Sequence, residues 1–422
     1  MSRAQKWENI PLRYVCELNP AVAFDEFDDN EDLTFLPMDK VKNGYFIPNT
    51  DKFLKYGASY TSFEDGDILL AKVTPCFENG NIAIADDLIS GKGFGSSELF
   101  VIRPKAAERR FLFYYFQSSI FKQDGEASMT GAGGLKRVSP DVLRQHHLPC
   151  PSRNVQRKIV NYLDCETGRI DALIAEKERM LALLEEKRAA LISRVVTRGL
   201  DPGAPLKPSG QKWLGEIPVH WEVRTLKRSS SKIDTGTTPS ASFMDGSLHS
   251  DFTWFTPSDF EHGGVIVESN RKIPQEAVDA GEAKSFPANS LMVIGIGATL
   301  GRVASSSAEF SANQQINVIT TLPSVHWNYL LYVLHGYEDV FRAHANSATL
   351  PILNQERLGV IRVPVPPATE QNKIVRKLDE SRAAYAEVKR LLGDSIALLK
   401  ERRAALITAA VTGQIPLEEM IG

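Results

Sequence analysis

Hydrophobic side chains recur at every seventh position in two stretches of the chain, interrupted once by a lysine, with charged residues between them. The two stripes run through Leu163, Ile170, Lys177, Leu184 and Leu191, and through Leu378, Tyr385, Leu392, Leu399 and Leu406. Spacing of seven is typical of helices that pair as a coiled coil. Each stretch covers about 40 residues, or roughly 60 Å at 1.5 Å per residue. We therefore predict two long helices that pair antiparallel.

Boundary signals support both helices. Prolines precede each of them, at Pro149 and Pro151 and at Pro364, Pro366 and Pro367. Asn154 and Thr369 have side chains suited to N-caps. Gly199 and Gly413 follow the last helical residues, where glycine commonly ends a helix.

The two helices are copies of one another at a constant offset of 215 residues. Segment 149-PCPSRNVQRKIVNYLD-164 aligns with 364-PVPPATEQNKIVRKLD-379, and 186-EKRAALISRVVT-197 aligns with 401-ERRAALITAAVT-412. Over the 50 pairs from 149/364 to 198/413 there are 19 identities, and none lies between residues 165 and 181. The ends of the helix are therefore repeated and its middle is not, which indicates an internal duplication.

The segments beside the helices also resemble each other, in an α+β pattern of short apolar strands bounded by turn residues. Trp7 corresponds to Trp221, segment 35–39 to 255–259, and segment 66–70 to 289–293. Helices are expected over 109–121 and 327–342. The predicted order is a first domain (1–151), a first helix (152–200), a linker with a second domain (201–366), and a second helix with a C-terminal tail (367–422). The linker, 201-DPGAPLKPSGQKWLG-215, is rich in proline and glycine.

Composition places the chain among globular proteins and excludes several classes. MSRAQKWENI lacks the apolar core of a signal peptide, and no apolar run is long enough to span a bilayer. The four cysteines are widely spaced, which argues against a disulfide scaffold or a zinc site and fits the reducing cytoplasm. Residues 1–151 carry 17 basic and 21 acidic side chains, and residues 201–366 carry 13 and 16. Both predicted domains are therefore acidic, whereas each helix carries three more basic than acidic residues.

Catalytic motifs are missing from the chain. It lacks a P-loop and the Asn-Pro-Pro-aromatic or Asp-Pro-Pro-aromatic motif of adenine methyltransferases. The glycine-rich segment 295–301 has the wrong spacing for a dinucleotide site and reads as a tight turn between strands. Asp259 with Glu282 and Lys284 only superficially resembles a nuclease cluster. We expect no metal site and no catalytic residue.

Side chains that suit base and phosphate contacts gather in a few loops of the two domains. Arginine matches guanine, and asparagine or glutamine matches adenine. The candidate DNA-binding residues are Lys72, Ser96, Ser97, Lys136 and Arg137 in the first domain, and Thr237, Thr238, Arg302, Asn313, Gln314 and Gln315 in the second. Lys136 and Arg137 follow a glycine loop at 131–134. Each of these residues alone also fits a surface or turn role.

Taken together, the chain resembles the specificity subunit of type I restriction-modification enzymes. The resemblance rests on the repeated Pro-x-Pro, Gln-x-Lys-Ile-Val and Leu-Asp helix starts, on the EKRAALI and ERRAALI helix ends, and on 213-WLGEIPVHWEVRTLK-227 and 254-WFTPSDF-260. It covers essentially the whole chain. Segment 35–39 is less typical, because it lacks the tryptophan and the Thr-Pro of the second copy.

The resemblance implies a non-catalytic subunit with two target recognition domains, each reading half of a split sequence in double-stranded DNA. The paired helices would set the spacing and dock two methyltransferase subunits, with restriction or translocase subunits added. S-adenosylmethionine, ATP and magnesium would bind to those partners and not to this chain. The residues expected to pair the helices or bind partners are Gln156, Lys158, Ile159, Leu163, Leu184, Leu191, Gln371, Lys373, Ile374, Leu378, Leu399 and Leu406.

Three alternatives stay open from the sequence. A self-contained enzyme would need motifs that the chain lacks. A coiled-coil adaptor without nucleic acid would not need two α+β domains with divergent loops. A specificity subunit of a methylation-only or related bipartite-site system has the same sequence features as our main interpretation.

Overall fold

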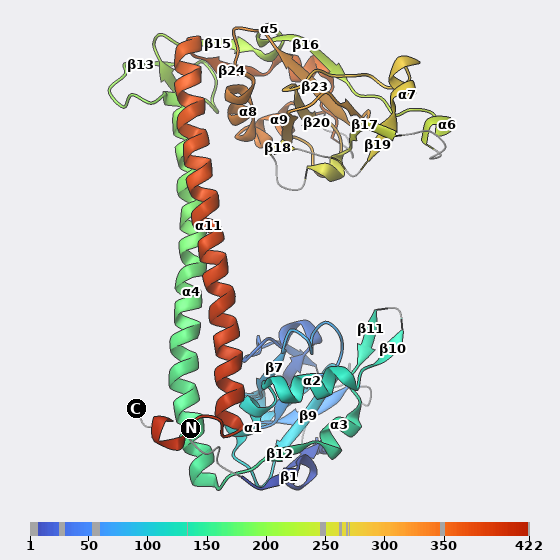
Figure 1. Ribbon diagram of the computed structural model, residues 1–422, viewed down its shortest axis with the longest axis vertical. Coiled ribbons are helices and arrows are strands. Elements are labelled where there is room, and N and C mark those ends of the chain that lie inside the picture. Colours follow the sequence, from blue (N-terminus) through green and yellow to red (C-terminus); the bar gives the residue numbers. More distant parts are fainter. Residues whose placement is uncertain are drawn as a thin grey trace. The chain divides into compact units, whose positions relative to one another are not determined.

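The protein forms two compact units, each containing one α+β domain and parts of both long helices. The structure, a computed structural model, describes residues 7–24, 30–52, 60–132, 134–244, 250–260, 264–266, 269, 271–346 and 351–420. The first unit combines Met1–Arg179 with Leu391–Gly422, and the second is Met180–Arg390. Each unit therefore contains one part of both long helices. Figure 1 colours and labels the elements along the chain.

The first unit contains two four-stranded sheets. Their orders are β2-β9-β6-β7 and β4-β3-β8-β5, and β1–β12 and β10–β11 form smaller pairs. The strands are β1 (Asn9–Pro11), β2 (Cys16–Leu18), β3 (Asp32–Leu36), β4 (Thr50–Lys52), β5 (Thr61–Glu64), β6 (Ile68–Ala71), β7 (Ile82–Ile84), β8 (Lys92–Gly95), β9 (Leu99–Pro104), β10 (Thr130–Ala132), β11 (Leu135–Arg137) and β12 (His147–Pro149). The helices are η1 (Leu12–Tyr14), η2 (Met38–Lys40), η5 (Ile89–Gly91), α1 (Arg109–Tyr115), α2 (Ser119–Ala127), α3 (Pro140–Gln145) and η7 (Leu417–Met420).

The second unit repeats this plan. Its larger sheets have the orders β16-β23-β20-β21-β18 and β19-β17-β22. The strands are β13 (Leu206–Pro208), β14 (Glu216–Pro218), β15 (Glu222–Thr225), β16 (Ser230–Thr235), β17 (Ser250–Phe255), β18 (Gly264–Ile266), β19 (Lys272–Pro274), β20 (Leu291–Ile294), β21 (Val303–Ser306), β22 (Ser311–Ala312), β23 (Ile316–Thr321) and β24 (Arg362–Val365). The helices are α5 (Leu226–Ser229), α6 (Ala241–Met244), η6 (Pro257–Asp259), α7 (Gln275–Asp279), α8 (Trp327–His335), α9 (Glu338–His344) and α10 (Gln355–Val360).

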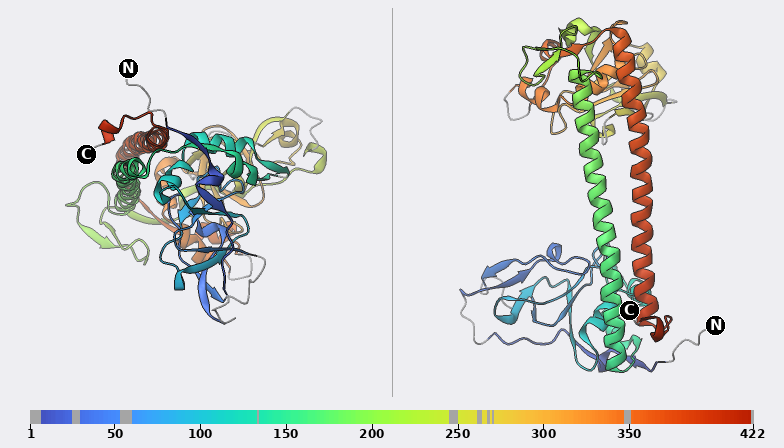
Figure 2. Two further views of the ribbon diagram at one scale, coloured as in Figure 1. Left: turned by 90° about the horizontal axis from the view of Figure 1, so that it is seen from below. Right: turned by 90° about the vertical axis from the view of Figure 1, so that its left-hand side faces the viewer.

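The two long helices are α4 (Arg153–Arg198) and α11 (Ala368–Val411), and Figure 2 shows them running side by side. They pair antiparallel inside each unit. In the first unit Arg403 Nε lies 2.9 Å from Asp171 Oδ1, and Lys400 Nζ lies 3.9 Å from Glu178 Oε1. In the second unit the Tyr385 hydroxyl donates to Glu185. The predicted pair of long helices is thus present.

Each helix start is buried in the core of its own unit. Ile159 and Leu163 join a cluster with Phe111, Leu112 and the α11 residue Ile407. Ile374 and Leu378 join the corresponding cluster of the second unit, which also contains Val195 from the far end of α4. Burial of these side chains couples the folding of each helix end to that of the adjacent domain.

Several predicted boundaries were wrong in detail. α4 begins at Arg153 and α11 at Ala368, so Asn154 and Thr369 lie within the first helical turns and are not N-caps. The residues just before each helix accept its first main-chain hydrogen bond instead. The backbone N–H of Gln156 donates to the Ser152 carbonyl, and that of Gln371 donates to the Pro367 carbonyl. The predicted ends are confirmed, because Gly199 and Gly413 have φ of 74° and 72°, a left-handed conformation that favours glycine.

Other corrections concern the segments between the helices. The expected linker 201–215 contains β13, which pairs with β14, and Leu214 is buried in the core. The helices expected over 109–121 and 327–342 are each two helices, α1 and α2, and α8 and α9. The first break precedes Ser118, whose hydroxyl accepts from the Phe121 amide and caps a new helix, and the second lies at Gly336.

The duplication extends to strand register. Segment 66–70 matches 289–293 as predicted: Leu69 lies opposite Val101, and Met292 lies opposite Val318. The match of 35–39 with 255–259, however, is displaced by one residue. Leu36 lies opposite Gly95 just as Phe255 lies opposite Ala312, so Leu36 and not Phe35 corresponds to Phe255. The shared phenylalanine misled the alignment.

Candidate nucleic-acid interface

A three-residue turn before the central strand recurs in both units with the same main-chain hydrogen bonds. We call Ser96–Glu98 and Asn313–Gln315 the reading turns. In the first unit, backbone amides donate to backbone carbonyls in four pairs: Ser96 N–H to Leu36 O, Leu99 N–H to Ser96 O, Lys72 N–H to Glu98 O, and Val138 N–H to Lys72 O. The four corresponding pairs of the second unit are Asn313 N–H to Phe255 O, Ile316 N–H to Asn313 O, Gly295 N–H to Gln315 O, and Leu353 N–H to Gly295 O. All eight N···O distances fall between 2.8 and 3.2 Å.

The side chain at the first turn position also does the same thing in both copies. Ser96 Oγ accepts the Glu98 amide at 3.1 Å, and Asn313 Oδ1 accepts the Gln315 amide at 3.0 Å. Serine and asparagine both form such local turns. The backbone frame is therefore shared, whereas the side chains it presents are different.

The first unit brings its predicted DNA-binding residues together around this turn. The Lys72 amide bonds the turn directly, and Lys136 and Arg137 lie on β11, whose main chain bonds Thr74. The Arg137 guanidinium donates two hydrogen bonds to the Glu98 carboxylate, from Nη2 to Oε1 at 2.7 Å and from Nε to Oε2 at 2.9 Å. The hydrogen bond from Arg137 lowers the pKa of Glu98, so the pair is charged at neutral pH. Of the loop at 131–134, Gly133 lies outside the described residues, and its flanks form the β10–β11 hairpin.

The second unit gathers most of its predicted residues as well. The Thr238 hydroxyl donates to Gln314 Oε1, and the Thr237 amide donates to the Ala312 carbonyl. Asn313 Nδ2 donates to Gln315 Oε1 at 3.1 Å. Arg302 contacts a different segment, because its Nη1 donates to the Phe260 carbonyl at 3.1 Å. The segment 295–301 is a turn between β20 and β21, as predicted.

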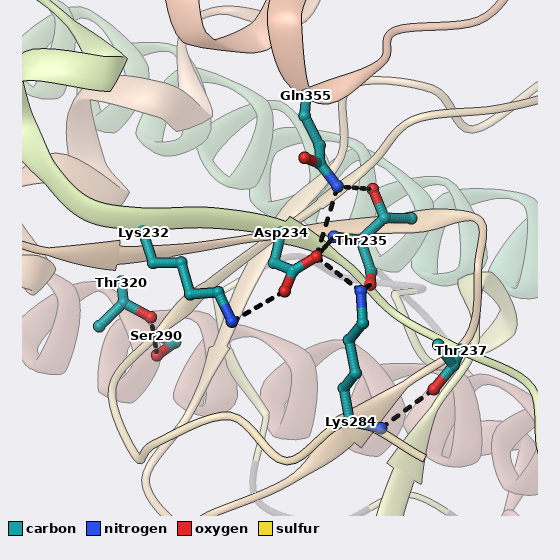
Figure 3. Close-up of polar contacts among 8 residues, drawn as sticks. All are labelled: Lys232, Asp234, Thr235, Thr237, Lys284, Ser290, Thr320 and Gln355. Atoms are coloured by element: carbon teal, nitrogen blue, oxygen red, sulfur yellow. Dashed lines mark hydrogen bonds and ion pairs between the residues drawn. The ribbon is translucent and has the colours of Figure 1, made fainter. Parts of the chain in front are cut away.

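A polar network anchors the loop that carries Thr237 and Thr238. Figure 3 shows Lys232, Lys284 and Gln355 converging on Asp234. Lys284 Nζ lies 2.7 Å from Asp234 Oδ1, and the Lys284 amide donates to Thr237 Oγ1 at 3.0 Å. Partial burial acts to raise the pKa of Asp234, but the hydrogen bonds from Lys284 and Lys232 outweigh it and lower the pKa to about 2. Asp234 is thus ionised at neutral pH and fixes the loop electrostatically.

Sequence reasoning missed the roles of Lys284, Gln355 and Arg271. The sequence groups Lys284 with Asp259 and Glu282, whereas in the structure Lys284 contacts Asp234 on β16. Arg271 Nη1 instead lies near η6, donating to Thr256 Oγ1 at 2.9 Å and Ser258 Oγ at 2.8 Å. These residues are 13 to 121 positions from their partners in sequence. A local pattern could not have revealed them.

The helix residues predicted to pair the helices or bind partners differ in how far their side chains are buried. Gln156 and Gln371 are each 1% exposed. Gln156 accepts the Glu108 amide at 2.7 Å, and Gln371 accepts the His326 amide at 2.7 Å. Each Nε2 also donates to a proline carbonyl. Ile159, Leu163, Ile374 and Leu378 are buried, Leu184, Leu191, Leu399 and Leu406 are half-buried, and Lys158 and Lys373 are exposed.

The aspartate that ends each repeated helix-start motif is bound to the adjacent domain in the same way. The Tyr114 hydroxyl donates to Asp164 at 2.6 Å, and the Tyr332 hydroxyl donates to Asp379 at 2.7 Å. The repeated Gln and Asp are therefore docking points between each helix and its own domain.

A family model for the type I restriction modification DNA specificity domain matches residues 4–179 and 218–389. The chain belongs to this family. Each of the two matched segments contains one reading turn and one helix start with its buried glutamine. The double match of the family model thus follows the duplication that the hydrogen bonds display.

Individual relatives agree with the family assignment. The chain is 36% identical over 159 residues to the type I restriction enzyme EcoAI specificity subunit and 35% identical over 159 residues to the EcoEI specificity subunit, both from Escherichia coli. Each alignment covers 36% of this chain, and it spans only 27% and 26% of the respective relative. The MjaX protein of Methanocaldococcus jannaschii, a putative specificity subunit, is 21% identical over 83% of this chain and 78% of its own length.

Solved structures share the fold of the chain. A chain from a study of complex assembly and conformational transition of the type I R-M system has a TM-score of 0.75 at 20% identity, covering 97% of this chain and 98% of that one. The HsdS subunit from Thermoanaerobacter tengcongensis has a TM-score of 0.53 at 19% identity, covering 97% of both chains. At this identity, the likeness concerns the fold.

The described part of the chain offers neither a metal-binding cluster nor a membrane-spanning helix. In that part of the chain, no three His, Cys, Asp or Glu side chains gather so as to hold a metal ion. None of the helices within it is long and apolar enough to cross a membrane.

Proposed function

We propose that the chain is the DNA-specificity subunit of a type I restriction-modification complex. Each of its two domains reads one half of a bipartite sequence in double-stranded DNA. The chain itself carries no catalytic residue. Methyltransferase subunits, and restriction or translocase subunits where these are present, bind S-adenosylmethionine, ATP and magnesium and carry out the chemistry in the cytoplasm.

The observation that carries this proposal is the duplicated reading turn. Eight main-chain hydrogen bonds fix the same frame twice, while the side chains change from Ser-Ser-Glu to Asn-Gln-Gln. Two readers of different sequences need that combination, because base identity is read by side-chain donors and acceptors.

Charge supports assembly with partners. The two domain segments are acidic, by 17 − 21 = −4 and 13 − 16 = −3, whereas residues 152–200 and 367–415 are basic, by 10 − 7 and 9 − 6. Binding of DNA depends strongly on neutralising phosphates with lysine and arginine. We therefore infer that the partner subunits supply a large share of the phosphate contacts.

The helices offer surface for those partners between their docked ends. Leu173, Met180 and Leu183 of α4 and Val388, Leu391 and Leu398 of α11 are 39–65% exposed. Large apolar side chains in this number on one helical pair are typical of a protein contact. We propose that methyltransferase subunits cover them.

The test is to express the chain with its neighbouring methyltransferase genes in a host without DNA methylation and to sequence the methylome. We expect one bipartite motif with methylated adenine, and no methylation when either the chain or the methyltransferase is omitted. Exchanging residues 216–360 for another such domain should change one half of the motif only. A contiguous motif, a change in both halves, or methylation by the chain alone would refute the proposal.

A further inference from the structure

The three positions of each reading turn have different tasks, and the tasks coincide in the two units. The first position closes the turn, because Ser96 and Asn313 accept the amide two residues later. Ser96 is half-buried, and Asn313 is 8% exposed. An acceptor that is committed to the main chain is poorly placed to read a base as well.

The third position is also committed. Glu98 is held by two ends of Arg137, and Gln315 Oε1 accepts from Asn313 Nδ2. Both side chains are half-buried. The backbone carbonyl of Glu98 accepts a hydrogen bond from the Lys72 N–H, and that of Gln315 accepts one from the Gly295 N–H. The third position therefore connects the turn to the neighbouring strand.

The middle position is the exposed one of the three in both copies. Ser97 and Gln314 are exposed, whereas the residues on either side are buried or half-buried. Ser97 borders an open hollow of about 400 Å³ that is lined by Phe35, Met38 and Tyr60. In the second unit the Thr238 hydroxyl donates to Gln314 Oε1, which fixes one end of the carboxamide.

We propose that Ser97 and Gln314 are the specificity-determining residues of the two reading turns, each contacting a base in its own half-site. This inference rests on the proposed function. The Gln314 carboxamide keeps its Nε2 hydrogens and the second lone pair of Oε1, and that donor–acceptor pair matches N7 and N6 of adenine in the major groove. Gln314 therefore reads an adenine. Ser97, a short hydroxyl, reaches less far and accepts more than one base.

The test uses the assembled complex of the full chain with its methyltransferase subunits. Its binding to duplexes that carry each base at each motif position is measured for wild type, Gln314→Ala and Ser97→Ala. A bidentate contact contributes about 1–3 kcal/mol of discrimination, or roughly 5- to 150-fold. Gln314→Ala should lower the preference for one adenine by that factor and leave the other half-site unchanged. Ser97→Ala should alter one position of the other half-site, with a smaller effect.

A matched variant separates base reading from a general effect of losing an exposed carboxamide. Gln275→Ala removes an exposed glutamine side chain from α7, in the same unit but outside the reading turn. We expect its preferred motif to equal that of wild type. The inference is overturned if Gln314→Ala retains full discrimination, if it alters both half-sites, or if Gln275→Ala relaxes the motif as much as Gln314→Ala. A wild-type complex without any bipartite motif would overturn the proposed function together with this inference.

Discussion

Replacement of Gln371 by alanine should destabilise the second unit far more than its position on a long helix suggests. The side chain is 1% exposed and makes three hydrogen bonds. Its Oε1 accepts the His326 amide at 2.7 Å, and its Nε2 donates to the carbonyls of Pro366 at 2.8 Å and Ser324 at 3.1 Å. Alanine leaves one amide and two carbonyls without these partners.

The magnitude follows from the desolvation of those groups. A buried donor or acceptor left unpaired costs about 1–3 kcal/mol, and a carbonyl is easier to satisfy otherwise because it has a second lone pair. Counting the His326 amide fully and the buried Pro366 carbonyl in part, and leaving out the carbonyl of exposed Ser324, gives a loss of about 2–4 kcal/mol. At an m-value of about 2–3 kcal/mol per M urea, the unfolding midpoint should fall by roughly 1–2 M. Gln371→Glu should behave similarly, because a carboxylate cannot donate to either carbonyl.

The assay is urea unfolding of the full chain followed by circular dichroism and tryptophan fluorescence. Asn372→Ala is the matched control, since Asn372 is exposed on the next helical position and its replacement should change stability by less than about 0.5 kcal/mol. Gln156→Ala tests the equivalent contact in the first unit. Equal midpoints for wild type and Gln371→Ala, or equal shifts for Gln371→Ala and Asn372→Ala, would refute the reasoning.

Two further predictions concern the reading turns. An added Cβ at Gly236 would lie 2.1 Å from the Ala312 carbonyl oxygen, so Gly236→Ala must displace the loop of Thr237 and Thr238. We expect weaker discrimination in one half-site together with a lower unfolding midpoint, and an unchanged motif would contradict this. Glu98→Gln removes the carboxylate that neutralises Arg137. The complex should then bind DNA of any sequence more tightly at low salt, and the slope of log binding constant against log salt concentration should steepen by about one. Binding titrations at several salt concentrations measure both quantities, and an unaltered slope would count against a role for Arg137 near phosphate.

The sequence predicted the elements whose signals are local or repeated. Heptad spacing located both long helices, and the repeat located the glutamines and aspartates that dock them. Its errors came from competition between nearby signals. Segment 109–121 is apolar enough for one helix, but the Ser118 hydroxyl caps a second one. The linker is rich in proline and glycine, yet β13 within it pairs with β14. Leu214 and Ile217 are buried and attach this hairpin to the core.

The candidate site was less predictable than the fold, for a physical reason. Residue types suggested Ser96 and Ser97 in the first turn and all three positions of the second, because Ser, Asn and Gln suit bases as well as turns. Only the hydrogen bonds separate the closing residue, Asn313, from the exposed one, Gln314. Lys284 and Asp234 are 50 positions apart, so their contact depends on the tertiary fold.

The charge pattern of the site separates specificity from affinity. Arg137 is paired with Glu98, and Lys284 with Asp234, so these cations bring little net charge to a phosphate. They keep the reading turns rigid instead, and a rigid side chain loses less entropy when it meets a base. We propose that affinity for the DNA backbone comes largely from cations outside these pairs, on the basic helices or on partner chains. Under this proposal the two domains discriminate bases efficiently only in the assembled complex, where those cations hold the DNA against the reading turns.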